Sequence, residues 1–572
     1  MNNKKRNIIF IIIGIILVAI SLYFIFINNK DDSNKENNDN KEIIDNNTEE
    51  KEDNKEQEEN NTNEDPNEEN KKDDDNKKEE QKENKKDNNK PVDNKTDNKS
   101  EDKKEEQKDN KEQEEKKEEP KEESKDLVIT KNEVIEGDYH CITINSSSDI
   151  SIELKNSNIN CPSGPAIKNI NNNKVEIKIT GNNTLIANTN KDLDGTIYTN
   201  GDLVLNGTGT LTIKSNFDGI VSKKKLSITG GTYDITVDDD GIRGKDRVEI
   251  LSSTITVNSK GDGIKTTNEE NNSEGYIRIL SGTFKINSLK DGFDASNYIE
   301  INNGTFVIKT GSGYKVKATS SAKAIKAEKS VKINRGTFSI DASDDGIHSN
   351  DSIYINGGSI NIKTADDAIH GDNLVEIHGG NFEIYNCFEG IESNIINITG
   401  GTLVIVSTDD GINAVDSELG ENDTNRSSKV TFSGGTTTII AKGDGIDSNG
   451  SIDITGGNVY VESTDFRFQT ALDHDKNLTI TGGTLIAVSK TIGEDDTGPK
   501  VSTIPMVINY DKGEGRITID SIEYMPQYGE YDAIMIASTK LTPGDTKLRY
   551  GNKSLDVTLT NGVTVYGVPN KK

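Results

Sequence analysis

The fold of this chain is decided by the stretch from 345 to 366, which reads DGIHSNDSIYINGGSINIKTAD. The same pattern begins again 22 residues later at Asp367. Its opening phrase, an acidic residue followed by Gly and Ile, starts at Asp218, Asp240, Asp262, Asp345, Glu389, Asp410 and Asp444, and variants start at Asp291, Lys323, Asp367 and Thr470. A repeat of this period indicates a solenoid, in which like positions of successive coils stack in columns.

Each repeat carries short runs in which apolar and polar residues alternate. In the quoted unit these runs are Ile353-Tyr354-Ile355 and 359–363, and Gly357-Gly358 separates them. β-Branched residues dominate the runs, and turns come too often for helices of useful length. We therefore predict an all-β chain built as a parallel β-helix, with coils ~4.8 Å apart and glycines where the turns need positive φ.

The N-terminal quarter has a different composition. Residues 8–27 form an apolar run behind a basic N-terminus, and about 20 such residues span a bilayer as a helix. We expect an uncleaved signal anchor there, with residues 1–7 in the cytoplasm and the rest of the chain outside the cell. Residues 28–126 are almost entirely Asn, Lys, Glu and Asp, which bury too little apolar surface to fold, so we expect a disordered tether.

The remainder divides into a solenoid and an end piece. We assign 127–500 to the β-helix, with 127–217 as degenerate early coils, and 501–572 to a small β cap over its open end. Three segments are expected to lengthen single turns into loops: 272–290, 311–322 and 415–428.

Composition narrows the possible partners. The net charge is −30 and no basic stripe follows the anchor, so nucleic acid is not an expected partner. Trp is absent, which argues against a sugar site built on Trp stacking. We expect a monomer. Cys141 and Cys161 lie nearly one repeat apart, so they either form a disulfide between adjacent coils or are two small buried residues.

Aligning the repeats on the Gly-Ile step places charged residues in columns. The position before the Gly gives what we call the acid column, which contains Asp218, Asp240, Asp262, Asp291, Lys323, Asp345, Asp367, Glu389, Asp410, Asp444 and Thr470. The position before that adds Asp239, Asp344, Asp366 and Asp409. The position after the apolar residue gives the mixed column, which contains Val221, Arg243, Lys265, Asp294, Lys326, His348, His370, Glu392, Asn413, Asp447 and Asp473.

A column of carboxylates needs compensation, because like charges ~5 Å apart repel by roughly 3 kcal/mol at an effective dielectric constant of about 20. Basic residues neutralise parts of the stack, but not the acid pairs at 344–345, 366–367 and 409–410. Clustered oxygen ligands suit Ca²⁺. The expected ligands are Asp240, Asp262, Asp291, Asp294, Asp344, Asp345, Asp366, Asp367, Asp409, Asp410, Asp444, Asp447 and Asp473. The strongest sets are the run from 344 to 367 and the group of Asp444, Asp447 and Asp473.

Two other interpretations of these residues stay open. An Asp before Gly often caps local N–H groups in a turn, and surface acids can also point into solvent. His348 and His370, one coil apart, form either a paired imidazole site for a metal or for acid/base work, or two polar surface positions. Together with Lys265 and Lys326 they are our expected sugar contacts.

The Asp-Gly-Ile and Gly-Gly-Thr phrases, and the run from Ala471 to Leu485, resemble a bacterial family of extracellular calcium-binding β-helix proteins described as carbohydrate-binding domain proteins. The resemblance covers about 127–568. It implies a right-handed parallel β-helix like that of pectate lyases, bound Ca²⁺, and binding of acidic polysaccharide such as polygalacturonate, or of cellulose. The chain departs from the family's acid at Lys323 and Thr470, which weakens the case for calcium at those coils.

The expected function is therefore Ca²⁺-dependent, non-catalytic carbohydrate binding at the cell surface. The first alternative is a polysaccharide lyase, which needs Ca²⁺ on the substrate carboxylate and a base for the C5 proton, with Arg243, Lys265 and Lys326 as candidate bases. The second is a structural stalk or an adhesin for a protein partner. A Ser-His-Asp order, a phosphate loop and an H-E-x-x-H motif are all missing from the sequence.

Overall fold

The computed structural model describes residues 125–416, 419, 427–464, 469–490 and 499–568. These residues form strands and no helix, which confirms the all-β prediction. The described residues therefore contain no helix that is long and apolar enough to cross a membrane. The expected anchor at 8–27 and the tether up to 124 lie outside the described residues. Lys125 and Asp126, which we expected in the tether, instead begin strand β1.

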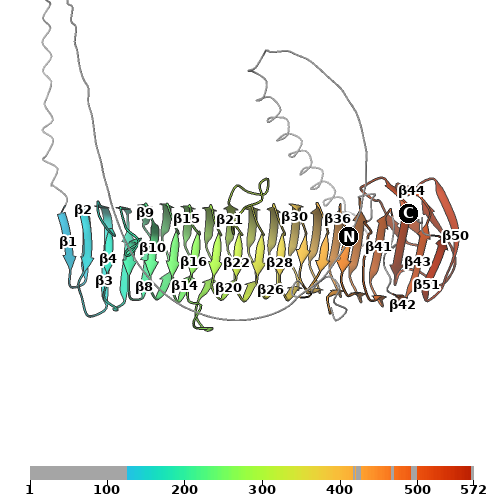
Figure 1. The fold of residues 1–572 in the computed structure, drawn as a ribbon, viewed down its shortest axis with the longest axis horizontal. Coiled ribbons are helices and arrows are strands. Elements are labelled where there is room, and N and C mark those ends of the chain that lie inside the picture. Colours follow the sequence, from blue (N-terminus) through green and yellow to red (C-terminus); the bar gives the residue numbers. More distant parts are fainter. Residues whose placement is uncertain (1–124, 417–418, 420–426, 465–468, 491–498, 569–572) are drawn as a thin grey trace, which may run out of the picture. The chain divides into compact units, whose positions relative to one another are not determined.

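Successive coils pair as parallel strands at the same register, and Figure 1 shows them side by side along one axis. In one such row, Ile325 pairs with Ile347 and Ile347 with Ile369. The Gly-Ile alignment therefore gives the register of the mixed column, in which Lys326, His348, His370 and Glu392 follow one another.

Most coils contribute three strands, and the coil that begins at Thr470 has only an isolated bridge at Leu472 in place of the first. The first follows the acidic turn, and these strands are β4 (Ile167–Asn169), β7 (Gly195–Thr199), β10 (Asp218–Ser222), β13 (Ile242–Gly244), β16 (Ile264–Thr266), β19 (Phe293–Ala295), β22 (Ile325–Ala327), β25 (Ile347–Ser349), β28 (Ile369–Gly371), β31 (Ile391–Glu392), β34 (Ile412–Ala414) and β37 (Ile446–Ser448).

The second strands precede the Gly-Gly turn, and they are β5 (Val175–Thr180), β8 (Leu203–Gly207), β11 (Lys225–Ile228), β14 (Arg247–Ile250), β17 (Tyr276–Ile279), β20 (Tyr298–Ile301), β23 (Ser330–Ile333), β26 (Ser352–Ile355), β29 (Leu374–Ile377), β32 (Ile395–Ile398), β35 (Lys429–Phe432), β38 (Ser451–Ile454), β40 (Leu478–Ile480) and β42 (Lys500–Ser502).

The third strands follow that turn, and they are β6 (Asn182–Ala187), β9 (Thr210–Ser215), β12 (Thr232–Val237), β15 (Thr254–Ser259), β18 (Thr283–Ser288), β21 (Thr305–Thr310), β24 (Thr337–Ala342), β27 (Ser359–Thr364), β30 (Asn381–Cys387), β33 (Thr402–Ser407), β36 (Thr436–Ala441), β39 (Asn458–Ser463) and β41 (Thr484–Ser489).

The first coils use longer strands. β1 (Lys125–Ile129) pairs with β2 (Glu133–Ile144), and β2 pairs in turn with β3 (Ile150–Cys161) and β4. Cys141 and Cys161 form a disulfide between these coils. The two alternatives left open by the sequence are thereby resolved in favour of the disulfide.

The inward-facing residues of all three strands form one continuous core. Ile, Leu and Val fill most of it, and a stack of aromatic rings fills one corner. Phe306 lies between Phe284 and Phe338, with ring centroids 4.8 and 4.5 Å apart and planes within 3° of parallel. Burial of equivalent apolar residues in every coil is what holds the coils together.

The repeat contains glycine at two kinds of position, and each requires glycine for a different physical reason. The second Gly of the Gly-Gly turn does need positive φ, as at Gly358 with φ of 120°. Gly346, in the acid-Gly-Ile step, is not at positive φ, so our turn explanation is wrong there. A Cβ at Gly346 would lie 2.6 Å from the carbonyl oxygen of Ala368 and 2.7 Å from Ile362 Cγ2, so close approach of the next coil requires the glycine.

One of the three predicted loops is present, because the chain leaves the strand pattern between β21 and β22. Most of the loop predicted at 415–428 lies outside the described residues. The prediction of a loop at 272–290 is wrong, because β17 and β18 occupy most of that range and the inserted loop is 267–275. We placed the insertion too late because Tyr276–Ile279 was not recognised as a second strand.

The chain after β42 covers the open end of the solenoid. β43 (Pro505–Tyr510) and β48 (Ala533–Ser538) extend the row of third strands, β48 running antiparallel to both β41 and β43, and β51 (Gly562–Gly567) pairs with β43. The other strands are β44 (Gly513–Glu514), β45 (Ile517–Ile519), β46 (Ile522–Tyr524), β47 (Glu530–Tyr531), β49 (Gly544–Tyr550) and β50 (Lys553–Leu559). They enclose a second apolar cluster against β41.

One carboxylate ties this cap to the solenoid. Glu462 of β39 is 2% exposed. Its carboxylate accepts hydrogen bonds from the Tyr524 hydroxyl at 2.5 Å and from the backbone N–H groups of Gln527 at 3.0 Å and Tyr528 at 3.2 Å.

Candidate functional site

The acids of the acid column point along the solenoid axis; those from Asp218 to Glu389 are buried, and Asp410 and Asp444 are partly buried. Asp218 and Asp262 are each 1% exposed. The Oδ1 atom of each accepts a hydrogen bond from the backbone N–H of the equivalent residue in the next coil, at 3.0 Å for Asp218 and Asp240, 2.8 Å for Asp240 and Asp262, and 2.9 Å for Asp262 and Asp291. A backbone hydrogen bond therefore occupies Oδ1 of each of these carboxylates and leaves Oδ2 available for a cation.

Basic side chains from the mixed column supply that cation in the N-terminal half. The Arg243 guanidinium contacts Asp194 and Asp218. The Lys265 ammonium lies 2.5 Å from Asp262 Oδ2 and 2.9 Å from Asp294 Oδ2. Lys326 Nζ lies 3.6 Å from Asp294 Oδ1 and 3.9 Å from Asp291 Oδ2.

These ion pairs fix the charge of the basic groups. Burial opposes the charged form of Arg243 and Lys265, yet the neighbouring aspartates outweigh it and raise the pKa of both side chains above their usual values. Burial also raises the pKa of the Asp218 carboxyl to about 6, although Arg243 opposes that rise. Lys265 and Lys326, our expected sugar contacts, are thus members of ion-pair networks.

A lysine also enters the set from Asp344 to Asp366. Ligand atoms of Asp344, Asp345 and Asp366 lie within 4.8 Å of one another, so the structure brings these predicted residues together. The expectation that no base neutralises them is wrong. Lys323 Nζ lies 2.8 Å from Asp344 Oδ1 and 2.7 Å from Asp345 Oδ2, and Lys317 Nζ lies 2.7 Å from Asp366 Oδ2.

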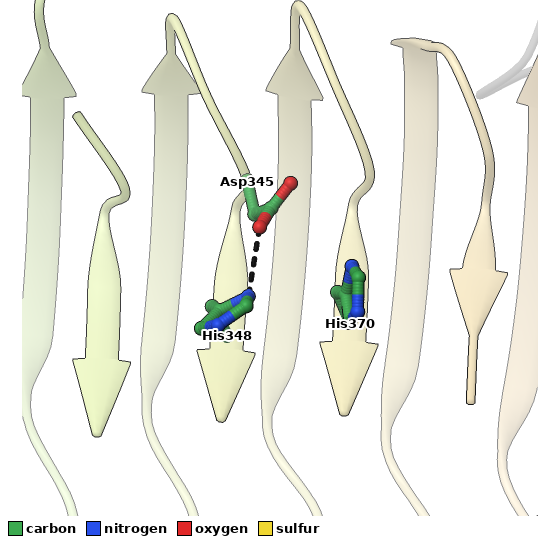
Figure 2. A group of neighbouring side chains, drawn as sticks. All are labelled: Asp345, His348 and His370. Atoms are coloured by element: carbon green, nitrogen blue, oxygen red, sulfur yellow. Dashed lines mark hydrogen bonds and ion pairs between the residues drawn. The ribbon is translucent and has the colours of Figure 1, made fainter. Parts of the chain in front are cut away.

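Histidines follow in the next two coils. His348 on β25 and His370 on β28 lie side by side with ring centroids 5.0 Å apart (Figure 2). His348 Nδ1 is 2.8 Å from Asp345 Oδ2, and His370 Nδ1 is 3.2 Å from Asp367 Oδ2. Burial opposes ionisation of Asp345, but the His348 hydrogen bond and the Lys323 charge together hold the pKa of that carboxyl well below its usual range.

Beyond the histidines the column is acidic. Glu389 is 7% exposed, and burial together with the charge of Glu392 raises the pKa of its carboxyl to about 11. Its Oε1 accepts a hydrogen bond from Asn413 Nδ2 at 3.1 Å. Within the described part of the chain, no donor reaches the buried Oε2 of Glu389 or the buried Oδ1 of Asn413.

The last coils continue the same pattern. Asp410 Oδ1 accepts from the N–H of Asp444 at 2.6 Å, and Asp444 Oδ1 accepts from the N–H of Thr470. Burial raises the pKa of Asp410 and Asp444 to about 7 each, and burial together with Asp410 and Asp473 raises the pKa of Asp447 well above its usual value. No ion pair joins Asp410, Asp444 or Asp447 to a Lys, Arg or His side chain of the described segments.

The predicted ligands therefore gather unequally. Groups whose ligand atoms lie within 4.8 Å of one another are Asp218 with Asp239 and Asp240, Asp262 with Asp291 and Asp294, Asp344 with Asp345 and Asp366, Asp345 with His348 and His370, and Asp367 with His370 and Glu392. Asp444, Asp447 and Asp473 are in none of these groups, although their charges act on one another. Asp409 precedes Asp410 at the same turn and is half-buried.

Sequence reasoning missed several participants. Glu389, Glu392 and Asn413 stood in the aligned columns, so their position was a usable signal. The sequence contained no such signal for Lys317, because this residue lies in an inserted loop 49 residues before its partner Asp366. Glu462 lies outside both columns.

A cleft lies at the junction of solenoid and cap, beside the last acidic turn. Its lining includes Lys442, Ser463 and Lys490 from the solenoid and Tyr528 and Tyr531 from the cap. Lys442 is two residues before Asp444, so the cleft and the acidic end of the column share one turn. Lys490 lies 3.7 Å from Asp532 Oδ1.

The fold and site define a class of protein. It is a parallel β-solenoid with a column of carboxylates, in which basic side chains of the described residues neutralise the acids of the N-terminal coils but not Asp410 or Asp444 beyond Glu389. The model of the carbohydrate-binding domain-containing protein family matches residues 125–368 and 367–523, and the chain belongs to that family. No curated protein matches the chain. A solved structure of a polysaccharide lyase-like protein from C. thermocellum, a gadolinium derivative, is 24% identical, with 37% of this chain and 88% of that chain covered and a TM-score of 0.32. At that TM-score the likeness adds nothing to the assignment.

Proposed function

We propose that this chain is a non-catalytic, Ca²⁺-dependent binder of acidic polysaccharide. The observation that carries the proposal is the acidic end of the column, from Glu389 to Asp447, in a member of a carbohydrate-binding family. Polysaccharide as the class of partner follows from the family. Calcium, the uronate substrate and the absence of catalysis are the parts that need testing.

The residues of this end fit a hard divalent cation. Asp410, Asp444, Asp447 and Glu389 offer carboxylate oxygens, and Asn413 offers an amide oxygen, which are the ligand types that Ca²⁺ takes. The buried Glu389 Oε2 and Asn413 Oδ1 have no donor among the described residues, so each has a lone pair to give. The raised pKa values of Asp410 and Asp444 show what ionisation costs without a counter-charge.

Sugar recognition would combine bound calcium with the adjoining cleft. Calcium at this end would supply positive charge with open coordination positions for sugar carboxylates. Lys442 forms no ion pair with any described residue and offers a second positive group. Tyr528 is 56% exposed and offers a ring face to a pyranose.

The catalytic alternative is weakened by the state of its candidate bases. A lyase base must lose its proton before it can take one from C5. Arg243 and Lys265 are held as cations by neighbouring aspartates, which raise the pKa of both groups. We therefore expect no unsaturated product when the chain is incubated with polygalacturonate and Ca²⁺. Absorbance from such a product would show that the chain is a lyase and not a non-catalytic binder.

For location, we propose a cell-surface protein held by the apolar run at 8–27. The support is the length of that run and the basic residues before it. The polar stretch that follows would carry the solenoid away from the membrane.

The deciding experiment is retention of the full chain on insoluble polygalacturonate and on cellulose, in Ca²⁺ and in EDTA. We expect retention on polygalacturonate that EDTA abolishes and that Asp447→Asn weakens. Asp262→Asn is the matched control, because Lys265 already neutralises Asp262. Equal retention in EDTA would show that binding does not depend on Ca²⁺. If neither polygalacturonate nor cellulose retained the chain, a protein partner would be favoured instead.

A further inference from the structure

The paired histidines precede the acidic end of the column and share none of its proposed calcium ligands, and their hydrogen bonds leave a chemical problem. His348 Nδ1 faces Asp345 Oδ2 at 2.8 Å, and Nε2 faces Asn350 Oδ1 at 2.8 Å. The Asn350 amide is oriented by its own Nδ2, which donates to Glu328 Oε2 at 2.6 Å, so the oxygen is the atom toward the ring. Both ring nitrogens of His348 therefore face acceptors.

His370 has the same arrangement one coil later. Its Nδ1 lies 3.2 Å from Asp367 Oδ2, and its Nε2 lies 3.4 Å from Asp372 Oδ1 and 4.0 Å from Glu392 Oε1. A neutral imidazole has one N–H and one lone pair, so it satisfies only one acceptor. Each ring needs either a second proton or a metal ion on one nitrogen.

Protonation of both rings is one solution. Burial opposes the charged form of His370, but Asp367 and Glu392 outweigh it and raise the pKa of that ring to about 9. Two protonated rings would nevertheless place positive charges on ring centroids 5.0 Å apart, and His348 is only 8% exposed. One dication shared by two neutral rings removes that repulsion. Each ring then keeps its Nε2–H for an oxygen acceptor, which is how metal-bound histidines are usually held.

We propose that His348, His370 and Asp345 form a binding site for a transition-metal dication of the Zn²⁺ type. Figure 2 shows Asp345 and the two rings on neighbouring coils, and one ligand atom from each lies within 4.8 Å of the others. His348 binds through Nδ1, because Asn350 holds its Nε2–H. Two imidazoles and one carboxylate suit Zn²⁺ and disfavour Ca²⁺, which prefers oxygen ligands. Lys323, which also contacts Asp345, retains Asp344 as a partner.

This site is independent of the calcium proposal, so the two can fail separately. The test is titration of the full chain with Zn²⁺ in the presence of millimolar Ca²⁺, followed by a competing chromophoric chelator. We expect one site that Ca²⁺ does not displace, and a loss of affinity of ~10-fold or more in His348→Gln and in His370→Gln. His378→Gln is the matched control, because that half-exposed ring contacts Thr399 and Glu376 outside the column.

A second measurement does not depend on the variants folding. In the unmodified chain, Zn²⁺ should protect His348 and His370 from ethoxycarbonylation, read out by peptide mass spectrometry, while His378 stays reactive. The proposal is overturned if Zn²⁺ leaves the reactivity of both rings unchanged, if both glutamine variants bind Zn²⁺ like the unmodified chain, or if Ca²⁺ displaces Zn²⁺ equally well.

Discussion

Replacing Asp444 by Asn should stabilise the protein when calcium is absent. Burial raises the pKa of Asp444 from 3.8 to about 7. A carboxyl whose pKa is raised in the folded state gives a contribution to stability that is complete below its unfolded value and is lost as the pH rises through about 7. At pH 8 the ionised group therefore disfavours the fold by roughly 4 kcal/mol, at about 1.4 kcal/mol per pKa unit.

Asn carries no charge at any pH, and its Oδ1 can still accept the N–H of Thr470. We therefore expect Asp444→Asn to raise the thermal midpoint of the full chain in EDTA most strongly at pH 8. The increase should be smaller at pH 5, where the raised pKa still costs about 1.7 kcal/mol, and should vanish below the unfolded pKa of 3.8. In Ca²⁺ the sign should reverse, because the variant lacks a carboxylate ligand that the cation would otherwise neutralise.

The matched control is Asp262→Asn, in the same column seven coils closer to the N-terminus. Its Oδ2 lies 2.5 Å from Lys265 Nζ, so removing this charge takes a partner from a largely buried ammonium. We expect this variant to lower the midpoint in EDTA and in Ca²⁺ alike. The reasoning would be refuted if Asp444→Asn lowered the midpoint in EDTA at pH 8, or if Ca²⁺ stabilised both variants to the same extent.

Three further predictions concern the scaffold. Phe306→Ala removes the middle ring of the stack and should cost about 3–5 kcal/mol in urea unfolding, whereas replacing the exposed Val307 beside it should change the midpoint little. Glu462→Ala leaves the Gln527 and Tyr528 N–H groups without their acceptor, so limited proteolysis should release fragments of the 505–568 cap before the solenoid is cut; an unchanged digestion pattern would contradict this role. Reducing the Cys141–Cys161 disulfide, which closes a loop with a sequence separation of 20, should weaken the first coils by about 3 kcal/mol, seen as faster amide exchange in β2 and β3 with no change near β37.

The repeat made most of the architecture predictable. Because the spacing is constant, aligning the Gly-Ile steps gave the partners across coils, and the pairing of Lys326 with His348 and of His348 with His370 follows it. The alignment failed where a coil departs from the spacing. The loop at 267–275 shifts the phase of one repeat, and the strand at Tyr276 was assigned to that loop.

The sequence predicted which residues stand in each column better than it predicted which of their charges are neutralised. Asp344 and Asp345 were expected to lack a base, yet Lys323 lies between them. A lysine side chain is long enough to reach a neighbouring coil, and its direction depends on what surrounds it rather than on its place in the repeat. Spacing therefore located the acids without indicating which of them are neutralised.

The sequence by itself determined that this chain forms a stacked β-solenoid and that carboxylates line one edge of it, because a 22-residue period places like residues above one another in every coil. Only the tertiary structure decided how the two oxygens of each carboxylate are used. One accepts the N–H of the next coil, and the other meets Arg243, Lys265 or Lys323 in the first coils, a histidine in the middle, and further acids beyond Glu389. The physical reason is that a period fixes backbone positions, whereas burial and the reach of side chains from other coils and loops fix charge.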